Sequence, residues 1–350
     1  MTPLLLKALR CENFNSRPPV WLMRQAGRYM PQYRALREQY TFLEMCRTPE
    51  IAAEVTQLPI DAFGMDAAIL FSDILVTVAA LGLDLHFDDG IGPVIDNPIA
   101  TTEQVYHLPT PNVEEKLGYV RDAIRLLKQT LSVPLIGFCG APFTVASYMI
   151  EGGTSKKFKK TKQWMLNNSE AFHQLLQHLA ICTADYINMQ IAAGADAIQI
   201  FDSWAHILTH YHFHEFSLHY IEELMARIDN PDIPIILFCR GSSLFAQDLA
   251  EAAPSAISLD WGGDLAAIRR ALPGNIALQG NLDPDILYAA PQTVKSETLR
   301  ILDKMSGDPG YIFNLGHGIL PDTPVVSVTT LVETIKSYVP TTSCDPRSRH

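Results

Sequence analysis

Short apolar runs rich in β-forming residues recur along the chain, and each ends in a glycine or polar residue before a segment with helical spacing. This alternation indicates repeated strand–helix units. The runs are too continuously apolar for half-exposed antiparallel strands, and they fit parallel strands buried on both faces. Eight strands are predicted, at Val20–Met23, Ala67–Phe71, Leu135–Phe138, Ala197–Phe201, Ile235–Phe238, Ala256–Leu259, Ile276–Leu278 and Tyr311–Phe313.

Segments with apolar positions three and four residues apart lie between these runs and predict helices. The predicted helices are Pro49–Gln57, Val113–Leu131, Ser169–Ala193, Phe213–Ile228, Leu244–Ala252, Leu265–Ala271, Thr293–Met305 and Pro324–Tyr338. The stretch Leu83–Pro98 breaks the rhythm because it carries Asp-Asp-Gly and Gly-Pro turn signals. It predicts a hairpin inserted after the second strand.

Eight strand–helix units with right-handed crossovers predict an α/β fold of the (β/α)8 TIM-barrel type, with the active site at the C-terminal mouth of the strands. An open doubly wound sheet is the alternative. The barrel is favoured because polar residues follow the strands, where they would converge on the mouth: Arg24, Ser72-Asp73, Cys139-Gly140, Asp202-Ser203, Arg240-Gly241, Asp260-Trp261, Gln279-Gly280-Asn281 and Asn314 to His317. We expect one domain over residues 1–350, with loose termini at 1–18 and 340–350.

The composition narrows the class of protein. The chain has 350 residues, 47% of them hydrophobic, and a formal net charge of -11, so nucleic acid is a poor partner. The N-terminal sequence lacks the pattern of a signal peptide. The longest apolar tract, Asp66–Leu85, carries Asp73 and argues against a membrane span. Six cysteines without a C-x-x-C pair are typical of reduced thiols, which favours the cytoplasm.

Arginines gather near the N-terminus of this acidic chain. Five lie between Trp21 and Arg47, against two glutamates. Arg24 and Arg28 flank Gly27, which we expect to adopt a backbone conformation closed to other residues. The planar guanidinium suits carboxylate recognition, so this stretch predicts an anion-binding site. Asp73 follows the neighbouring predicted strand; it either joins the site or forms a structural ion pair with one of the arginines.

Three further side chains at predicted strand ends or nearby are candidate ligand contacts. Tyr148 lies on a short helix and offers a hydroxyl, unless it is a core residue. Ser203 follows a strand without the flanking glycines of a nucleophilic serine, and is interpreted as a hydrogen-bond donor. His317 lies between Gly316 and Gly318, which let it approach a ligand closely, although it could instead fasten the rim.

Five histidines also cluster in one short stretch: His206, His210, His212, His214 and His219. The spacing of His210 and His214 allows a metal pair. No carboxylate with clear spacing completes a metal set in the sequence, so we predict no metal site and interpret these histidines as surface or core residues.

The sequence resembles the uroporphyrinogen decarboxylase family over nearly its whole length. The motifs that carry the resemblance occur in family order: MRQAGRYMPQYR, DAAILFSDIL, GAPFTVASYMIEGG, QIFDSWA, GNLDP and NLGHGILPDTP. The resemblance implies a cytoplasmic, homodimeric TIM-barrel lyase of haem and porphyrin biosynthesis. It would remove the four acetate carboxyl groups of uroporphyrinogen III to give coproporphyrinogen III, and it would be cofactor-independent.

The resemblance also implies roles for particular residues. Catalysis would fall to Asp73, Arg24 and Tyr148, and substrate binding to Arg24, Gly27, Arg28, Asp73, Tyr148, Ser203 and His317. Asp73 would accept pyrrole N–H bonds and favour a cationic intermediate. Arg24, a water molecule or the substrate's own carboxyl are the candidate proton donors. Two other classes stay open: a zinc methyltransferase of the wider superfamily and a non-catalytic tetrapyrrole binder.

Overall fold

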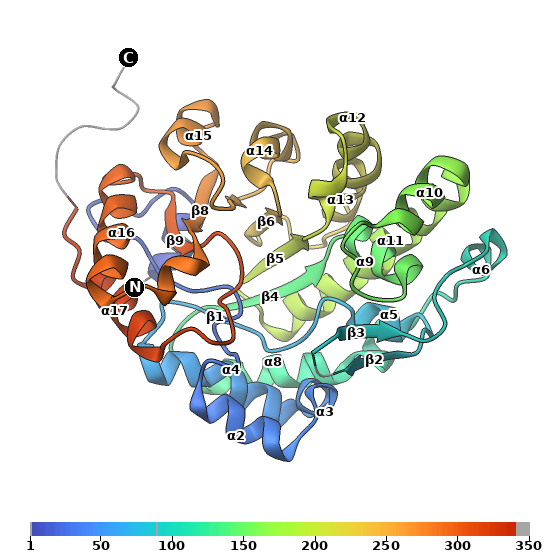
Figure 1. The fold of residues 1–350 in the computed structure, drawn as a ribbon, viewed down its shortest axis with the longest axis horizontal. Helices are drawn as coiled ribbons and strands as arrows, with labels where there is room; N and C mark the ends of the chain where they lie inside the picture. The colour runs from blue at the N-terminus through green and yellow to red at the C-terminus, as the bar shows by residue number, and fades with distance from the viewer. Residues whose placement is uncertain (1, 89, 341–350) are drawn as a thin grey trace.

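The computed structural model describes residues 2–88 and 90–340. Its main sheet is parallel and strongly curled (Figure 1). The strands follow one another in chain order as β1 (Ala68–Ile69), β4 (Leu135–Gly140), β5 (Ala197–Asp202), β6 (Ile235–Cys239), β7 (Ala256–Ser258), β8 (Ala277–Leu282) and β9 (Tyr311–Leu315). A separate antiparallel hairpin consists of β2 (Leu85–Asp88) and β3 (Gly92–Ile95). Seven predicted strands and the inserted hairpin are therefore confirmed.

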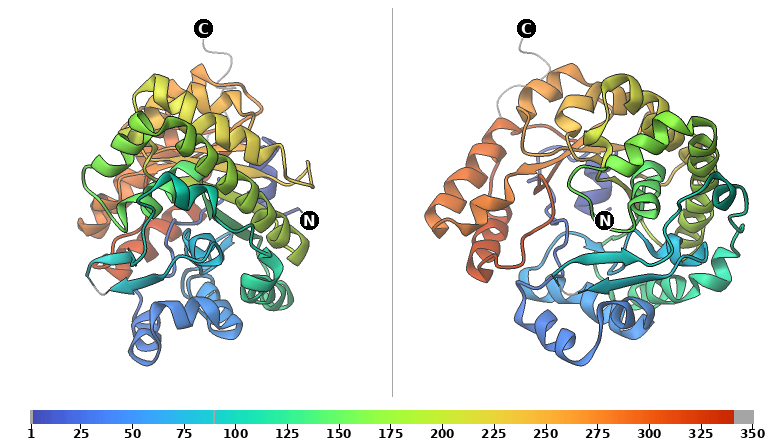
Figure 2. Two further views of the ribbon diagram at one scale, coloured as in Figure 1. Left: turned by 90° about the vertical axis from the view of Figure 1, so that its right-hand side faces the viewer. Right: turned by 45° about the vertical axis from the view of Figure 1, so that its right-hand side comes forward.

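Helices cover the curled sheet, most of them as a surrounding outer layer (Figure 2). They are α1 (Leu4–Leu9), α2 (Pro31–Gln39), α3 (Phe42–Arg47), α4 (Pro49–Phe63), α5 (Val76–Ala80), α6 (Thr102–Tyr106), α7 (Val113–Lys116), α8 (Gly118–Thr130), α9 (Pro142–Glu151), α10 (Lys159–Asn167), α11 (Ser169–Ala193), α12 (His210–Phe213), α13 (His219–Met225), α14 (Ser242–Glu251), α15 (Leu265–Ala271), α16 (Pro291–Lys304) and α17 (Val325–Lys336). Short 3-10 helices η1 (Ala205–Ile207) and η3 (Pro284–Tyr288) and the π-helix η2 (His214–Leu218) complete the set. Over residues 2–88 and 90–340, none of these helices combines the length and apolar character needed to cross a bilayer.

The predicted first strand, Val20–Met23, is present only as a single bridge. Val20 pairs in parallel with Phe313 of β9. The Phe313 N–H donates to the Pro19 carbonyl at 2.9 Å, and the Asp66 N–H donates to the Val20 carbonyl at 2.8 Å. This segment thus lies between β9 and the residues that lead into β1, but the predicted first strand is not confirmed as a regular strand.

Side chains accept hydrogen bonds from the backbone N–H groups that a longer first strand would have paired with its neighbours. The Val20 and Leu22 N–H groups donate to the side chains of Asp66 and Gln25, and the Met23 N–H donates to Oδ1 of Asn314. Backbone N–H groups bonded in this way are satisfied without a strand ladder. The chain can therefore turn early and bring the following arginines to the mouth of the sheet.

The interior of the curled sheet is filled by apolar side chains and sealed at one end by α1. Leu5 and Leu9 of this helix are 0% and 2% exposed and pack with the fully buried Trp21. The segment at residues 1–18 that was expected to be loose therefore contains a packed helix, because the leucines of α1 have a core to cover. The other expected loose end, 340–350, falls almost entirely outside the described residues.

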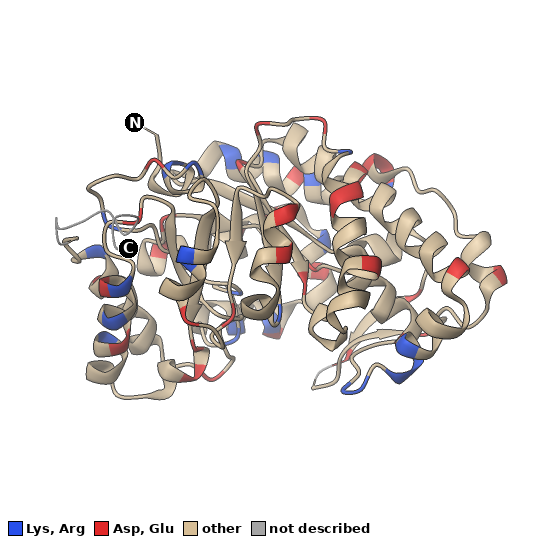
Figure 3. Cartoon of the chain, turned by 90° about the horizontal axis from the view of Figure 1, so that it is seen from above, with Lys and Arg blue, Asp and Glu red and all other residues tan. Residues whose placement is uncertain are grey.

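Two predicted helices keep their bounds and two are divided. α11 and α15 begin and end where the sequence predicted. The predicted helix Val113–Leu131 is broken at Leu117 into α7 and α8. The predicted helix Phe213–Ile228 is made of the end of α12, then η2 and α13. Lys and Arg as well as Asp and Glu are scattered over the outer helices (Figure 3), so this layer carries charge of both signs.

Candidate active site

A cavity of about 580 Å³ opens at the carboxyl ends of the strands. It lies where active sites occur in barrel-type α/β folds. All the predicted site residues line it, although they come from five separate parts of the chain. They are Arg24, Gly27, Arg28, Asp73, Tyr148, Ser203 and His317.

The arginine loop is fastened to the sheet by Gln25, whose side chain is fully buried. Its Nε2 donates to the Ala67 carbonyl at 3.1 Å, and its own carbonyl accepts from the Tyr29 hydroxyl at 2.7 Å. Gln25 is therefore an anchor, whereas the exposed Arg24 and Arg28 on either side of it line the cavity. Nothing in the local sequence pattern marks Gln25 as this anchor.

The unusual backbone conformation in this loop belongs to Arg24, not to Gly27. Arg24 has φ of 61°, in the left-handed region that non-glycine residues rarely adopt. Gly27 lies outside that region, so the expectation for it was wrong; a Cβ there would instead lie 3.2 Å from the Arg24 carbonyl oxygen. Non-glycine residues held in this conformation cluster at functional sites, because the surrounding structure must hold them there.

Gly318 makes room for the Arg24 side chain. A Cβ at position 318 would lie 2.5 Å from Cδ of Arg24, closer than real carbon contacts allow. The glycine after His317 is therefore needed to let the guanidinium cross toward the cavity. This packing couples the last strand end to the arginine loop.

Asp73 brings a carboxylate to the cavity beside the arginines. Its Oδ1 accepts the Leu75 N–H at 2.8 Å, and the residue lines the cavity and is only partly covered by the rest of the protein. Burial in the wall raises the pKa of Asp73 to about 6, although the Leu75 N–H and the Arg24 charge oppose the shift. Asp73 is thus mostly ionised at neutral pH, and a positive charge beside it would be stabilised.

His317 is a neutral donor. Burial, reinforced by the charge of Arg24, lowers the pKa of His317 to about 4. Its Nδ1 accepts the Gly318 N–H at 2.7 Å, so the remaining proton is assigned to Nε2. An imidazole in this tautomer can donate one hydrogen bond from Nε2 to a ligand.

Tyr148 and Ser203 bring hydroxyl groups from neighbouring elements. Tyr148 projects from α9, packs against the Trp204 ring at 5.8 Å between centroids, and is 8% exposed. Burial and the nearby Asp73 carboxylate raise the pKa of Tyr148, which keeps its hydroxyl protonated at neutral pH. Ser203 follows β5 and lines the same cavity. Both can donate hydrogen bonds to an anionic ligand.

A row of phenylalanines crosses the cavity wall and was missed by the sequence analysis. Phe138, Phe201 and Phe238 come from β4, β5 and β6, with successive ring centroids 5.7 Å apart. The row continues to the His317 ring, 5.9 Å from that of Phe238. Each phenylalanine lies near the end of its strand, a position that could have revealed the pattern. The result is an apolar surface beside the charged groups.

The inserted hairpin forms another wall. Phe87, Ile91 and Pro93 line the cavity, and the Ile95 N–H ties the hairpin to the Gly152 carbonyl at 3.0 Å. Arg37, one of the five N-terminal arginines, also lines the cavity, although the sequence analysis did not place it among the site residues. The sequence predicted the hairpin but did not indicate that it lines the cavity.

Other polar residues at strand ends bond to one another instead of lining the cavity. Asp260 after β7 accepts the Gly241 N–H at 2.9 Å and the Ser243 hydroxyl, while its carbonyl accepts from Asn281 at 2.9 Å. Gln279 lies inside the sheet and accepts the Trp21 Nε1–H at 2.9 Å. The expected convergence of all strand ends therefore holds only for part of the mouth.

A curled parallel sheet with a cavity at its carboxyl edge, carrying fixed cations, a carboxylate beside them and an apolar wall, is an enzyme site of the barrel-type α/β class. The fold is shared with a methyltransferase from Methanosarcina mazei (TM-score 0.80, 21% identity, 96% of this chain and 98% of that one). A B12-independent methionine synthase from Shewanella sp. W3-18-1 is more distant (TM-score 0.54, 12% identity, 92% and 96% covered).

Sequence comparison identifies the family. The model of the family described as uroporphyrinogen decarboxylase matches residues 2–338. A uroporphyrinogen decarboxylase of Protochlamydia amoebophila is 54% identical over 95% of this chain and 91% of its own, and one of Chlorobaculum parvum is 45% identical over 95% and 97%. The chain belongs to the uroporphyrinogen decarboxylase family.

Proposed function

We propose that this chain removes the four acetate carboxyl groups of uroporphyrinogen III, without a cofactor, to give coproporphyrinogen III. Family membership supports the reaction. The observation that carries the proposal is the combination, in one cavity, of exposed arginines, a phenylalanine row and the Asp73 carboxylate.

The substrate combines an apolar ring system with eight carboxylates, and the cavity offers a partner for each part. Phe138, Phe201 and Phe238 would support the pyrroles by ring contacts and exclusion of water. Arg24 and Arg28 would bind acetate and propionate groups through paired N–H donors. Arg37 adds a third guanidinium at the same cavity.

Decarboxylation needs an electron sink, which the pyrrole itself can supply. Protonation of a ring carbon gives a cation; the bond between the acetate CH2 and its carboxylate then breaks, CO2 leaves, and the electron pair neutralises the ring. The CH2 carbon then gains a proton and the ring carbon loses one. The net change is one proton consumed and one CO2 released for each acetate.

Asp73 would stabilise the cation formed in this step. Its carboxylate would accept the pyrrole N–H groups, and a fixed charge in a partly dry cavity favours an opposite charge that develops during the reaction. Arg24, a bound water or a substrate carboxyl would deliver the proton. His317 through Nε2–H, with Tyr148 and Ser203 through their hydroxyls, would hold the side-chain carboxylates and orient the ring.

The test is anaerobic incubation of the full chain with uroporphyrinogen III and a chelator, followed by counting the product's carboxyl groups by mass. The proposal expects a product with four fewer carboxyls. Loss of activity with the chelator would favour a zinc methyltransferase-like site, and tight binding without CO2 release would indicate a tetrapyrrole binder. Either result would refute the proposal.

The proposal extends to the fold, the oligomeric state and the cellular compartment of the enzyme. We expect one domain with a complete (β/α)8 barrel, whose first strand is reduced to Val20, acting as a cytoplasmic homodimer. The buried thiols Cys46, Cys139, Cys182 and Cys239 are consistent with a reducing compartment. Light scattering of the purified chain would test the dimer.

A further inference from the structure

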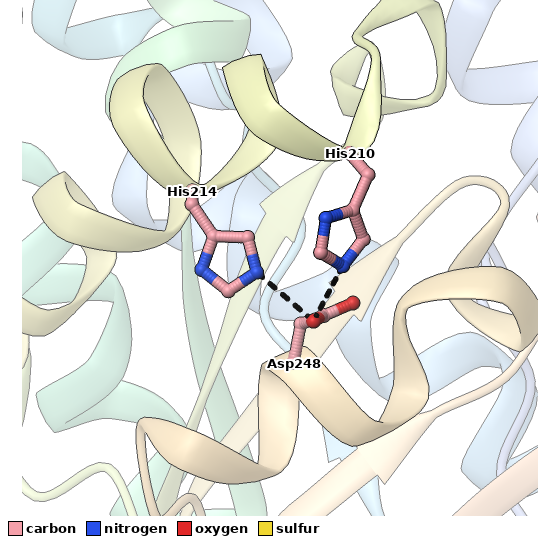
Figure 4. A group of neighbouring side chains, drawn as sticks. All are labelled: His210, His214 and Asp248. Atoms are coloured by element: carbon pink, nitrogen blue, oxygen red, sulfur yellow. Dashed lines mark hydrogen bonds and ion pairs between the residues drawn. The ribbon is translucent and has the colours of Figure 1, made fainter.

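Two of the clustered histidines meet a carboxylate that the sequence gave no reason to connect with them. His210 at the start of α12 and His214 at the start of η2 lie one turn apart, and both face Asp248 of α14 (Figure 4). Their ligand atoms all lie within 4.8 Å of one another. The statement that no carboxylate completes a metal set was therefore wrong.

The spacing suits a metal ion. Nε2 of His210 lies 3.0 Å and Nε2 of His214 lies 2.9 Å from Oδ1 of Asp248. Ligands about 2.1 Å from a tetrahedral Zn²⁺ are roughly 3.4 Å apart, so small side-chain rotations would admit the ion. Without an ion, the same atoms form two hydrogen bonds to a single oxygen.

The helices that carry the three side chains are held in a fixed relation. Phe213, next to His214, stacks on Phe245, one turn before Asp248, with ring centroids 4.2 Å apart and planes 9° from parallel. Both phenylalanines are buried, at 0% and 7% exposed. The Thr209 side chain accepts the His212 N–H and caps the start of α12. Metal sites need such rigid support, because misplaced ligands lose affinity.

The cluster is accessible to ions from solvent. The side chains of His210 and His214 are 70% and 36% exposed, whereas that of Asp248 is 13% exposed. The two histidines also line an open surface cavity of about 510 Å³ with His173, Glu215 and other residues. Three protein ligands beside an open space leave room for water as a fourth ligand.

We propose that His210, His214 and Asp248 form a binding site for a divalent first-row transition-metal ion such as Zn²⁺, which joins α12 and η2 to α14. Two imidazoles and one carboxylate suit Zn²⁺ or Co²⁺ far better than Mg²⁺ or Ca²⁺, which prefer all-oxygen sites. The three residues are separate from those that line the active-site cavity. The ion would therefore strengthen the outer helical layer, and decarboxylation would not need it.

The experiment titrates Zn²⁺ into the metal-stripped full chain by calorimetry, and Co²⁺ while recording its visible absorption. The wild type is expected to bind one tight equivalent, to give the intense Co²⁺ spectrum of low coordination number, and to melt at a higher temperature with Zn²⁺. His210→Ala and Asp248→Asn are expected to weaken this binding more than about 100-fold, since loss of even an outer partner costs 10–100-fold.

His212→Ala is the matched control. His212 lies on the same helix but outside the cluster, so its removal should leave the tight equivalent and the spectrum unchanged. His210 is largely exposed, so its truncation leaves the core intact. Wild-type protein without a tight equivalent, or variants that keep its affinity and stoichiometry, would overturn the proposal.

Discussion

The ends of β1 and β5 carry the same three residue types in different order. Phe71-Ser72-Asp73 follows β1, whereas Phe201-Asp202-Ser203 ends β5. Both phenylalanines line the cavity. After β1 the serine and the aspartate line it as well, whereas after β5 only the serine does and Asp202 does not. Burial raises the pKa of both Asp73 and Asp202 to about 6, so their titration does not distinguish the two.

The difference lies in their hydrogen-bond partners. The two carboxylate oxygens of Asp202 accept the Thr144 and Ser217 hydroxyls, each at 2.5 Å. Asp202 thereby joins β5 to α9 and to η2. Asp73 accepts the Leu75 N–H and otherwise faces the cavity, beside Arg24. A buried carboxylate that is fully satisfied by protein stabilises structure, and one left open toward a cavity is available to a ligand.

Of the variants that distinguish Asp73 from Asp202, Asp73→Asn should have the largest effect on turnover. The amide keeps the shape but loses the charge that stabilises the cation, so kcat should fall about 10²- to 10³-fold, as when an oxyanion-hole donor is removed. The melting temperature should change little. Steady-state rates with thermal melting check both, and normal turnover by this variant would remove Asp73 from the chemistry.

Arg28→Ala should have the next largest effect, confined to binding. Loss of a charge-assisted hydrogen bond of about 1.5–3 kcal/mol should raise KM roughly 10- to 100-fold and leave kcat nearly constant. Arg125→Ala is the matched control, because Arg125 lies on α8 outside the cavity with a side chain 59% exposed. Equal KM values for both variants would contradict an anion-binding role for Arg28.

Asp202→Ala should act on stability instead of on chemistry. Its removal leaves the buried hydroxyls of Thr144 and Ser217 without their acceptor, which should cost about 1–3 kcal/mol of unfolding free energy. Turnover should fall only modestly, because the change reaches the site indirectly, through Thr144, which lies one turn before Tyr148. Urea unfolding with parallel rates tests this, and a variant as stable as wild type would contradict the structural role.

A smaller effect should appear in the pH dependence of stability. The folded state holds the proton of Asp202 more tightly than the unfolded chain does, because burial raises its pKa from 3.8 to about 6. The contribution of Asp202 to the free energy of unfolding is therefore present below pH 4 and is lost as the pH rises through 6. The loss is at most about 1.4 kcal/mol per pH unit. Between pH 4 and 6, the unfolding free energy of Asp202→Asn, measured by urea titration, should fall less steeply with pH than that of the wild type. An equal slope for the two proteins would contradict the assignment.

Most of the fold could be predicted because buried parallel strands need continuous apolar runs. α11 and α15 also kept their predicted bounds, since their spacing is regular. Val20–Met23 has an equally apolar sequence, but the side chains of Asn314, Gln25 and Asp66 take its N–H groups. Asn314 and Asp66 are distant in the sequence, so a local pattern does not show them as partners of this segment.

The site could be predicted where polar residues follow strands and match family motifs, as for Arg24, Asp73 and His317. The local pattern could not decide which strand ends face the cavity and which bond to one another, as Asp202 does. Nor could it place Asp248 beside the histidines, since their contact joins helices that follow different strands. These features depend on packing between distant segments.

The most direct test of the central claim is the pH dependence of kcat/KM for the wild type and for Asp202→Asn. If ionised Asp73 stabilises the cation, kcat/KM should fall about tenfold per pH unit below a pKa near 6. The same acid limb should persist in Asp202→Asn. A flat wild-type profile from about pH 5 to 7, or an acid limb that disappears in Asp202→Asn, would contradict the claim.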